Sequence, residues 1–573
     1  MLSFKNGITS NGENDVKNTM VGDTLNSWSE EGKHLISQNF SEFRKLVAQA
    51  KDSLERKDYE TAAIYGEMAA SYATSKHPGL FVSPELEHIL LTIGRQVIKS
   101  TPYIRKNALS TKFPRKILHV GTSMVSIGGH SKMLRRWIDR DRERSHSLVL
   151  TRQFPNKVPK LLRDAVSNSD GKIYTLNNRV GSIVSWAKQL RELASDADLV
   201  VLHIHNYDVL PVITFANKEQ CPPIAFLDHG DHIFWLGASV SDVVISLRDS
   251  GMQIARQRRG IEAKRNVLLP INLEPIHRTL SRIEAKRQLN LPEDSVVVLS
   301  IARGIKYKTI NGTSFADAHV PLLKQHQNAI LIVIGAGDRQ DWSNAIQQTN
   351  GRIKSFSETD NTDVYYQAAD IYVDSYPFSS NTSLLEAGCY EIPLVSRFPY
   401  ASEACAILGA DAPGLTNKLI HVGDLEEYTS VLSKLVQDEE YRNTLGKATR
   451  QKIIDTHVGK SWQRTLEDIY AYIPTLAPIS VSSHPIDRVI LDEPDVLIPR
   501  VFGSDTEMSC DRMLQWYLPL MPTDKRFCCW LDLIKQYGIS NYPFKLLLPE
   551  WFRCNYYFYR SYLSSVSFGK GDR

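Results

Sequence analysis

The sequence predicts an α/β protein with two doubly wound sheets in tandem, preceded by a helical domain and followed by a C-terminal extension. From residue 116 onward, short apolar runs alternate with helical segments, a pattern typical of parallel strands buried on both faces. The series restarts after residue 270, which indicates a second sheet. A chain of 573 residues is also too long for a single domain.

The composition is that of an ordinary globular protein, with 42% hydrophobic and 23% charged residues and a net charge of +4. That small charge argues against a nucleic-acid surface spread over the chain, and we expect no nucleic-acid partner. We find no apolar run of roughly 18 residues and no signal-peptide core near the N-terminus. The seven cysteines show no paired metal-ligand spacing. We therefore expect a cytoplasmic enzyme. Association of this enzyme with the inner face of the membrane is a further hypothesis.

The segment before the first strand divides into two parts. Residues 1–25 are polar and are predicted to be a disordered tail. Residues 26–112 are predicted to form a helical domain, because apolar side chains such as Phe43, Leu46 and Val47 recur at helical spacing. Residues 54–63 resemble one helix-turn-helix of the tetratricopeptide type, and we find no second copy.

Five strands are predicted in each sheet. In the first α/β domain, residues 113–275, they cover 116–120, 147–150, 199–203, 224–227 and 242–246. In the second, residues 276–475, they cover 295–300, 329–334, 352–356, 370–374 and 391–396. Ligands bind at the carboxyl ends of such strands, so the cleft between the two domains is the expected site.

The C-terminal extension, residues 476–573, begins rich in proline and ends aromatic and basic, as in 551–560. We predict a packing appendage. The alternative is a peripheral-membrane or protein contact made through this tail.

Residues 374–388 run from the end of a strand into a helix that begins near Ser380 or Asn381. The first N–H groups of a helix lack intrahelical partners and can hold a phosphate. Thr382, Ser383 and Glu386 lie three and four residues apart and share one helix face. Hydrogen-bond donors for an anion therefore lie one helix turn from a carboxylate. This arrangement predicts a nucleoside diphosphate site in which Glu386 accepts hydrogen bonds from the ribose hydroxyls.

A basic loop follows the strand at 295–300. Arg303 and Lys308 lie just beyond its carboxyl end, where two cations suit a departing pyrophosphate. The alternative is an ordinary basic surface loop. The opposing Thr382, Ser383 and Glu386 make this alternative less favoured, because they form the other half of a nucleotide site.

Two glycine-containing turns are further candidates. Gly128 and Gly129, followed by His130, would let a ligand approach the backbone closely, or would form a plain tight turn. Residues 335–337 form a G-x-G without the third glycine of a dinucleotide fingerprint. We interpret that segment as a strand-end turn near the nucleotide base.

Two aspartates and two histidines, Asp228, His229, Asp231 and His232, lie within five residues after a strand. An acid/base or substrate-orienting role is favoured over a metal site, since these residues are too close together for a structural zinc site. Surface histidines are the plain alternative, and the same choices apply to His203 and His205. We expect no bound metal.

With these residues in view, residues 113–475 resemble a GT-B glycosyltransferase of the family 4 type. The resemblance rests on three segments. They are the strand and glycine loop at 116–134, the Arg303 and Lys308 pair that would hold the donor diphosphate, and the Leu-Glu-Ala block at 385–387. The resemblance implies two Rossmann-like domains, no cofactor, and a final helix near 455–472 that returns to the first domain. It implies transfer from a UDP- or GDP-linked sugar to a glycan, lipid-linked or protein acceptor, as in polysaccharide biosynthesis.

One position departs from that pattern. Phe378 stands where the family carries a second glutamate, eight residues before the ribose glutamate. The run 374–378 and the Asn-Thr-Ser at 381–383 are instead similar to O-linked N-acetylglucosamine transferases. Family 4 implies retention and the other similarity implies inversion, so both outcomes stay open.

The resemblance also implies roles on the acceptor side. His229 would be the polar partner of the transferring sugar, with His232 second, and the acceptor would enter over Gly128 and Gly129. Competing hypotheses are an epimerase or phosphorylase on the same fold and a non-catalytic nucleotide-sugar-binding scaffold. An NAD enzyme is disfavoured by the missing glycine fingerprint.

Overall fold

The computed structural model describes residues 11–99, 114–125, 129–153, 158–274, 276, 278–310, 312–399, 405–479, 487–503, 508–538 and 544–556, with side chains from residue 26 onward except at 405, 406 and 510. The chain divides into two compact units. We call them the six-stranded unit, built from Met1–Ile36, Pro275–Thr456 and Leu491–Phe502, and the seven-stranded unit, built from Ser37–Glu274, His457–Ile490 and Gly503–Arg573.

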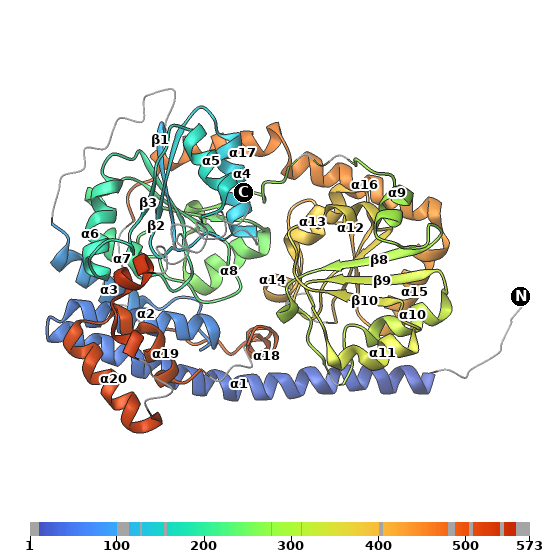
Figure 1. Cartoon of the computed structure of the whole chain (residues 1–573), viewed down its shortest axis with the longest axis horizontal. Coiled ribbons are helices and arrows are strands. Elements are labelled where there is room, and N and C mark those ends of the chain that lie inside the picture. Colours follow the sequence, from blue (N-terminus) through green and yellow to red (C-terminus); the bar gives the residue numbers. More distant parts are fainter. Residues whose placement is uncertain are drawn as a thin grey trace, which may run out of the picture. The chain divides into compact units, whose positions relative to one another are not determined.

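Each unit contains a wholly parallel sheet with helices around it (Figure 1). The strand order is β3-β2-β1-β4-β5-β6-β7 in one unit and β10-β9-β8-β11-β12-β13 in the other. Both orders reverse direction beside the first strand, between β1 and β4 and between β8 and β11. Such a reversal opens a crevice at the carboxyl ends of the strands, which is where these folds hold ligands. The two-sheet α/β prediction is confirmed.

The strands are β1 (Lys116–Gly121), β2 (Ser145–Leu150), β3 (Ile173–Thr175), β4 (Leu199–His203), β5 (Ile224–Asp228), β6 (Val243–Ser246), β7 (Asn266–Leu268), β8 (Val296–Ile301), β9 (Ala329–Ile334), β10 (Ile353–Phe356), β11 (Ile371–Val373), β12 (Leu394–Arg397) and β13 (Leu419–Val422). All ten predicted strands are present, nine of them within two residues at each end. The strands that the sequence did not predict are β3, β7 and β13, which are short and only partly buried. Their side chains therefore lack the continuous apolar run on which the prediction rested.

The principal helices are α1 (Asn11–Glu55), α2 (Tyr59–Ser75), α3 (Pro84–Val97), α4 (Gly129–Arg140), α5 (Lys160–Asn168), α6 (Ile183–Ala194), α7 (Leu210–Thr214), α8 (Asp249–Arg259), α9 (Arg282–Gln288), α10 (Val320–Gln325), α11 (Ser343–Gln348), α12 (Asp363–Ala368), α13 (Asn381–Cys389), α14 (Cys405–Leu408), α15 (Leu425–Gln437), α16 (Glu439–His457), α17 (Lys460–Tyr472), α18 (Ile498–Val501), α19 (Cys510–Tyr517) and α20 (Thr523–Tyr537). None of the described helices is long and apolar enough to cross a membrane.

The N-terminal region differs from the prediction in two ways. Helix α1 begins at Asn11, so the expected disorder over 1–25 is wrong from residue 11, and residues 1–10 lie outside the described part of the chain. The helices at 37–97 do not form a separate domain, because Phe43, Val47 and Leu90 share one buried core with Val200 and Leu202 of strand β4 in the Rossmann-like sheet. The predicted turn is present, and Asp58 caps α2 by accepting from the Thr61 N–H at 3.2 Å.

The C-terminal third also departs from the predicted boundaries. The six-stranded unit ends at Thr456 and not at 475, because α17 belongs to the seven-stranded unit, as the family resemblance implied for its final helix. Helix α18 belongs to the six-stranded unit, whereas α19 and α20 join the core of the other, beside α2 (Figure 1). Trp551 packs against that core. The rest of the aromatic tail, 557–573, lies outside the described residues, so its predicted surface contact stays a prediction.

Trp462 gives a test of how α17 is anchored. It is fully buried against Trp137, and its indole N–H donates to the Pro270 carbonyl at 2.7 Å. We expect Trp462→Ala to lower the free energy of unfolding by about 3–5 kcal/mol, the usual cost of removing a buried tryptophan. The control is Trp516→Ala, since Trp516 is 52% exposed. Equal urea midpoints for the two variants would contradict this packing.

Candidate functional site

The loop after β11 is built around one buried carboxylate. Asp374 Oδ1 accepts from the N–H groups of Ser375 and Ser380, each at 2.9 Å. Its Oδ2 accepts from the hydroxyls of Ser379 and, at 3.3 Å, Ser396. Burial raises the pKa of Asp374, and these hydrogen bonds oppose that shift. The carboxylate thereby fixes the path by which the chain turns into α13.

Helix α13 begins at Asn381, as predicted, with Ser380 at its N-cap. Among the described atoms, Ser380 makes no side-chain capping bond, and the buried Asn381 Oδ1 has no hydrogen-bond partner. Thr382 and Ser383 are half-buried, and Glu386 is 9% exposed one turn deeper. The Glu386 carboxylate adds to burial in raising the pKa of Tyr366 and Tyr390, which places it among these phenols.

The basic loop after β8 lies directly against this helix start. Tyr307 forms an isolated antiparallel bridge with Pro377, and the Lys308 N–H donates to the Tyr376 carbonyl at 3.3 Å. Lys306 Nζ donates to the Ser379 carbonyl at 2.8 Å and lies 4.3 Å from the centre of the Phe378 ring. The structure therefore brings together the two segments that the sequence picked out, and Phe378 lies between them.

The three cations of this loop differ in their surroundings. The Arg303 side chain is 76% exposed, with its Nε 3.7 Å from Glu358. Lys308 Nζ donates to the Arg500 carbonyl at 2.9 Å. Burial lowers the pKa of Lys306 to about 8, the Asp374 carboxylate opposes that shift and Arg303 adds to it. Lys306, which the sequence analysis did not select, thus lies nearest the turn into α13.

A strap formed by residues 491–502 lies on the same site, within the six-stranded unit. Phe502 packs edge-on against Phe378 with ring centres 4.3 Å apart, and the Arg500 carbonyl accepts from Lys308. The strap is itself tied to α1, where Ser29 Oγ donates to Glu493 at 2.5 Å and Arg500 pairs with Glu31. The C-terminal extension is therefore part of the candidate site.

The G-x-G turn at Gly335 lies next to the basic loop. Gly335 has φ +93°, and a Cβ there would overlap the carbonyl oxygen of Ala302. The N–H groups of Gly335 and Gly337 both donate to the Phe356 carbonyl, at 2.8 and 3.0 Å. This confirms a strand-end turn, while the contact with a nucleotide base stays a prediction.

In the seven-stranded unit the structure gathers histidines at the carboxyl ends of β4 and β5. One ring nitrogen each of His130, His203 and His229 lies within 4.8 Å of the other two. Burial lowers the pKa of His229 to about 3 and the pKa values of His130 and His203 well below the usual range. Gly129 begins α4, and Gly128 lies outside the described residues.

The remaining members of the Asp-His cluster are directed elsewhere. Asp231 forms an ion pair with Arg248 at 2.6 Å, and His232 lies 3.3 Å from the same carboxylate. Asp228 is buried 3.9 Å from Arg259, and burial raises its pKa. His229 is therefore the one member of this run that joins the histidine group, and the second-choice role of His232 stays a prediction.

The sequence analysis did not select two residues, Lys306 and His130, whose importance depends on contacts between distant parts of the chain. Lys306 was within the quoted loop, but only its burial beside Ser379 distinguishes it from Lys308. His130 was quoted only as the residue after two glycines. Its proximity to His203 and His229 follows from the crossover order of the sheet, which no local pattern reveals.

Comparison with known proteins gives the class. The sequence model of the family described as Glycosyl transferases group 1 matches residues 281–452, a range that contains every candidate residue of the basic loop and α13. No curated protein matches the chain by sequence. Similar solved structures include a glycosyltransferase from Rickettsia africae, at 12% identity over 63% of this chain and 99% of its own, with a TM-score of 0.49.

Two further structures are similar at comparable levels. HepE of Anabaena, solved in complex with UDP and glucose, is 14% identical over 63% of this chain and 100% of its own, with a TM-score of 0.47. An O-GlcNAc transferase of Thermobaculum terrenum, solved as a mutant, is 15% identical over 78% of this chain and 84% of its own, with a TM-score of 0.43.

Residues 281–452 thus form a Glycosyl transferases group 1 domain on a Rossmann-like sheet. The chain therefore carries a glycosyltransferase domain in its six-stranded unit, and its two parallel sheets agree with the GT-B fold that the sequence predicted. The resemblance inferred from the sequence is confirmed at this level, and its family 4 detail stays a prediction.

Asp374 provides the test of how this site is held. We expect Asp374→Ala to lower the free energy of unfolding on the order of 3 kcal/mol, because it leaves two N–H groups and two hydroxyls without their acceptor. Urea unfolding measures the effect, with Asp360→Ala, at an exposed position, as the control. Wild-type stability of Asp374→Ala would show that the loop does not depend on this carboxylate.

Proposed function

We propose that the enzyme binds a nucleotide-sugar donor, UDP- or GDP-linked, with the diphosphate at the start of α13. The observation that carries this is the pairing of the basic loop with the turn into that helix, through Tyr307 and Pro377 and through Lys306 and Ser379. The acceptor class stays as the sequence suggested: a glycan, a lipid-linked sugar or a protein. We expect the reaction to take place in the cytoplasm and to serve polysaccharide biosynthesis.

The diphosphate has three kinds of partner in this arrangement. The first turn of α13 offers N–H groups and the positive end of its dipole. Thr382 and Ser383 offer hydroxyls on the same face. Lys306 supplies a cation held at the turn, and the exposed Arg303 is free to reach a phosphate from the solvent side.

Glu386 would accept from the ribose hydroxyls. It lies one turn beyond Thr382 and Ser383 on α13, and its nearly buried carboxylate has fixed phenol neighbours in Tyr366 and Tyr390. A preoriented acceptor of this kind selects a nucleotide over an isolated phosphate, since only the nucleotide reaches both ends of the helix turn.

The same groups would promote bond cleavage. Negative charge builds on the outer phosphate as the glycosidic bond breaks, and cations and amides that are already in place stabilise that charge more than they stabilise the bound donor. In this proposal the protein's own cations neutralise the leaving group, so the donor needs no metal ion or other cofactor. The predicted contact of His229 with the transferring sugar remains part of the proposal for the acceptor side.

A panel of nucleotides tests the donor class. We expect UDP or GDP species to raise the melting temperature of the full chain, because a ligand that binds only the folded state stabilises it. Release of UDP or GDP that requires an acceptor identifies a transferase. Conversion of the free donor without acceptor would favour the epimerase, and binding without turnover would favour the scaffold.

Lysine variants test which cation acts on the diphosphate. We expect Lys306→Met to reduce kcat by about 10²–10³, the usual cost of removing one charge-stabilising donor. Lys308→Met and Glu386→Ala are expected to slow transfer as well, on the sequence argument. Lys324→Met is the control, because Lys324 is exposed and donates to Gln348. Full activity of both Lys306→Met and Lys308→Met would overturn the assignment.

The pKa of Lys306 predicts a pH dependence for donor binding. Its ammonium is charged below a pKa of about 8 and neutral above it, so attraction for the diphosphate is lost as pH rises through this value. We expect the Kd of UDP or GDP to rise by up to about tenfold per pH unit above 8. Calorimetry between pH 7 and 9 measures this rise, and Lys306→Arg should abolish it. A Kd that is constant for the wild type would contradict the role of Lys306.

A further inference from the structure

We propose that His130, His203 and His229 bind one divalent transition metal ion of the zinc class, in a site within the seven-stranded unit. One ring nitrogen of each lies within 4.8 Å of the other two. The rings of His130 and His229 are closest, with centres 4.1 Å apart, and the His203 ring lies 5.9 Å from that of His229. Ligand nitrogens on a tetrahedral zinc ion lie about 3.3 Å apart, so small side-chain rotations would complete the site.

Each of the three histidines has one buried ring nitrogen without a hydrogen-bond partner in the described structure. These are His130 Nε2, His203 Nδ1 and His229 Nε2. His130 and His229 are nevertheless partly exposed as residues. Leaving three such nitrogens unpartnered has a cost that a bound cation would remove.

A chain of hydrogen bonds fixes which nitrogen of His203 is available. The carbonyl of Asp141 can only accept, so His146 Nε2, 2.9 Å away, carries a proton. In the uncharged chain, His146 Nδ1 then accepts from His119 Nε2 at 2.9 Å, and His119 Nδ1 accepts from His203 Nε2 at 2.9 Å. The proton of His203 is thereby used on Nε2, and the unpartnered Nδ1 is left with its lone pair available to a ligand.

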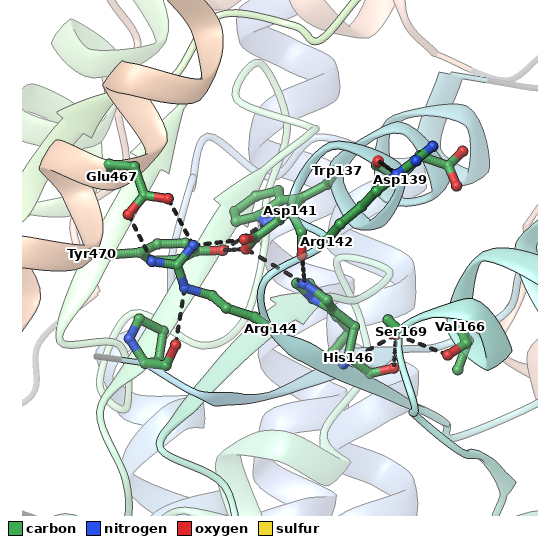
Figure 2. A network of polar contacts seen from close by, with 12 residues as sticks. Trp137, Asp139, Asp141, Arg142, Arg144, His146, Val166, Ser169, Glu467 and Tyr470 are labelled. Carbon is green, nitrogen blue, oxygen red and sulfur yellow. Dashed lines mark hydrogen bonds and ion pairs between the residues drawn. The ribbon is translucent and has the colours of Figure 1, made fainter. Parts of the chain in front are cut away.

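The far end of this chain is firmly held. Figure 2 shows Asp141 between His146, Arg144 and Tyr470. Arg144 donates to one carboxylate oxygen at 2.6 Å, and the Tyr470 hydroxyl donates to the other at 2.7 Å. Metal-binding histidines commonly have their second nitrogen fixed in this way by a carboxylate or carbonyl.

The buried Nε2 of His130 is likewise without a hydrogen-bond partner among the described residues. It is available as a ligand when the ring proton is on Nδ1. The hydrogen-bond chain thus fixes the tautomer of His203, and the surroundings of His130 Nε2 are compatible with the tautomer that a metal requires.

The set of ligands indicates the kind of ion. Three neutral imidazoles suit zinc and its neighbours, and they disfavour calcium and magnesium, which prefer oxygen. Three protein ligands also leave a fourth position for water or a substrate group, as in catalytic zinc sites. The ligands come from α4 and from the ends of β4 and β5, so sequence spacing could not reveal the set.

Metal content provides the test. The full chain is prepared without a histidine tag, stripped with a chelator and dialysed against Zn²⁺ or Co²⁺. We expect one ion per chain, with visible absorption from Co²⁺, and more than about tenfold weaker binding in His130→Ala and in His229→Ala. His205→Gln is the matched control, because His205 is close by and already contacts Ser123 and Tyr207.

The outcomes separate this site from the donor site. One ion in the wild type and His205→Gln, lost from His130→Ala and His229→Ala, supports the proposal even if no nucleotide binds. No stoichiometric ion, or equal ion content in the wild type and the His130→Ala/His229→Ala double variant, overturns it. UDP or GDP binding, measured on the same preparations, reports on the proposed function alone. Circular dichroism of each variant verifies folding.

Discussion

The candidate site of the six-stranded unit depends on the buried carboxylate of Asp374. Seven residues of irregular chain separate the end of β11 from the start of α13, and four hydrogen bonds to one side chain hold that path. Tyr307, Lys306 and Lys308 are positioned by contacts with the same segment. The loop is thus held by a buried side chain beneath it and by the strap that packs on Phe378.

The fold was largely predictable, because buried parallel strands are continuous apolar runs. The segments at 199–203 and 329–334 coincide with β4 and β9. The domain boundaries were less predictable. Apolar periodicity marks 43–50 as a helix face but does not say which surface covers it, and that surface proved to be the sheet domain. Likewise, proline spacing at 474–499 gave no sign that the chain visits both units after Thr456.

The candidate site was predicted in outline because its two halves are each local in sequence. Glu386 follows Thr382 by four residues, and the basic loop directly follows a strand. The choice between Lys306 and Lys308 depends on burial and on a carbonyl 192 residues away, which no local pattern contains. The histidine chain could not be predicted from the sequence, because its members lie on β1, β2 and β4, which become neighbours only through the crossover order of the sheet.

The strap at 491–502 has a consequence for how this enzyme is studied. A fragment trimmed to the recognisable domain, 281–452, would keep every residue that the family match covers. It would lose Phe502 from the face of Phe378 and the carbonyl that Lys308 engages, together with the α1 segment that anchors both. Rate constants measured on such a fragment would describe a site in which Lys308 and the Phe378 ring are exposed to water. The activity of this site should therefore be measured on the intact chain.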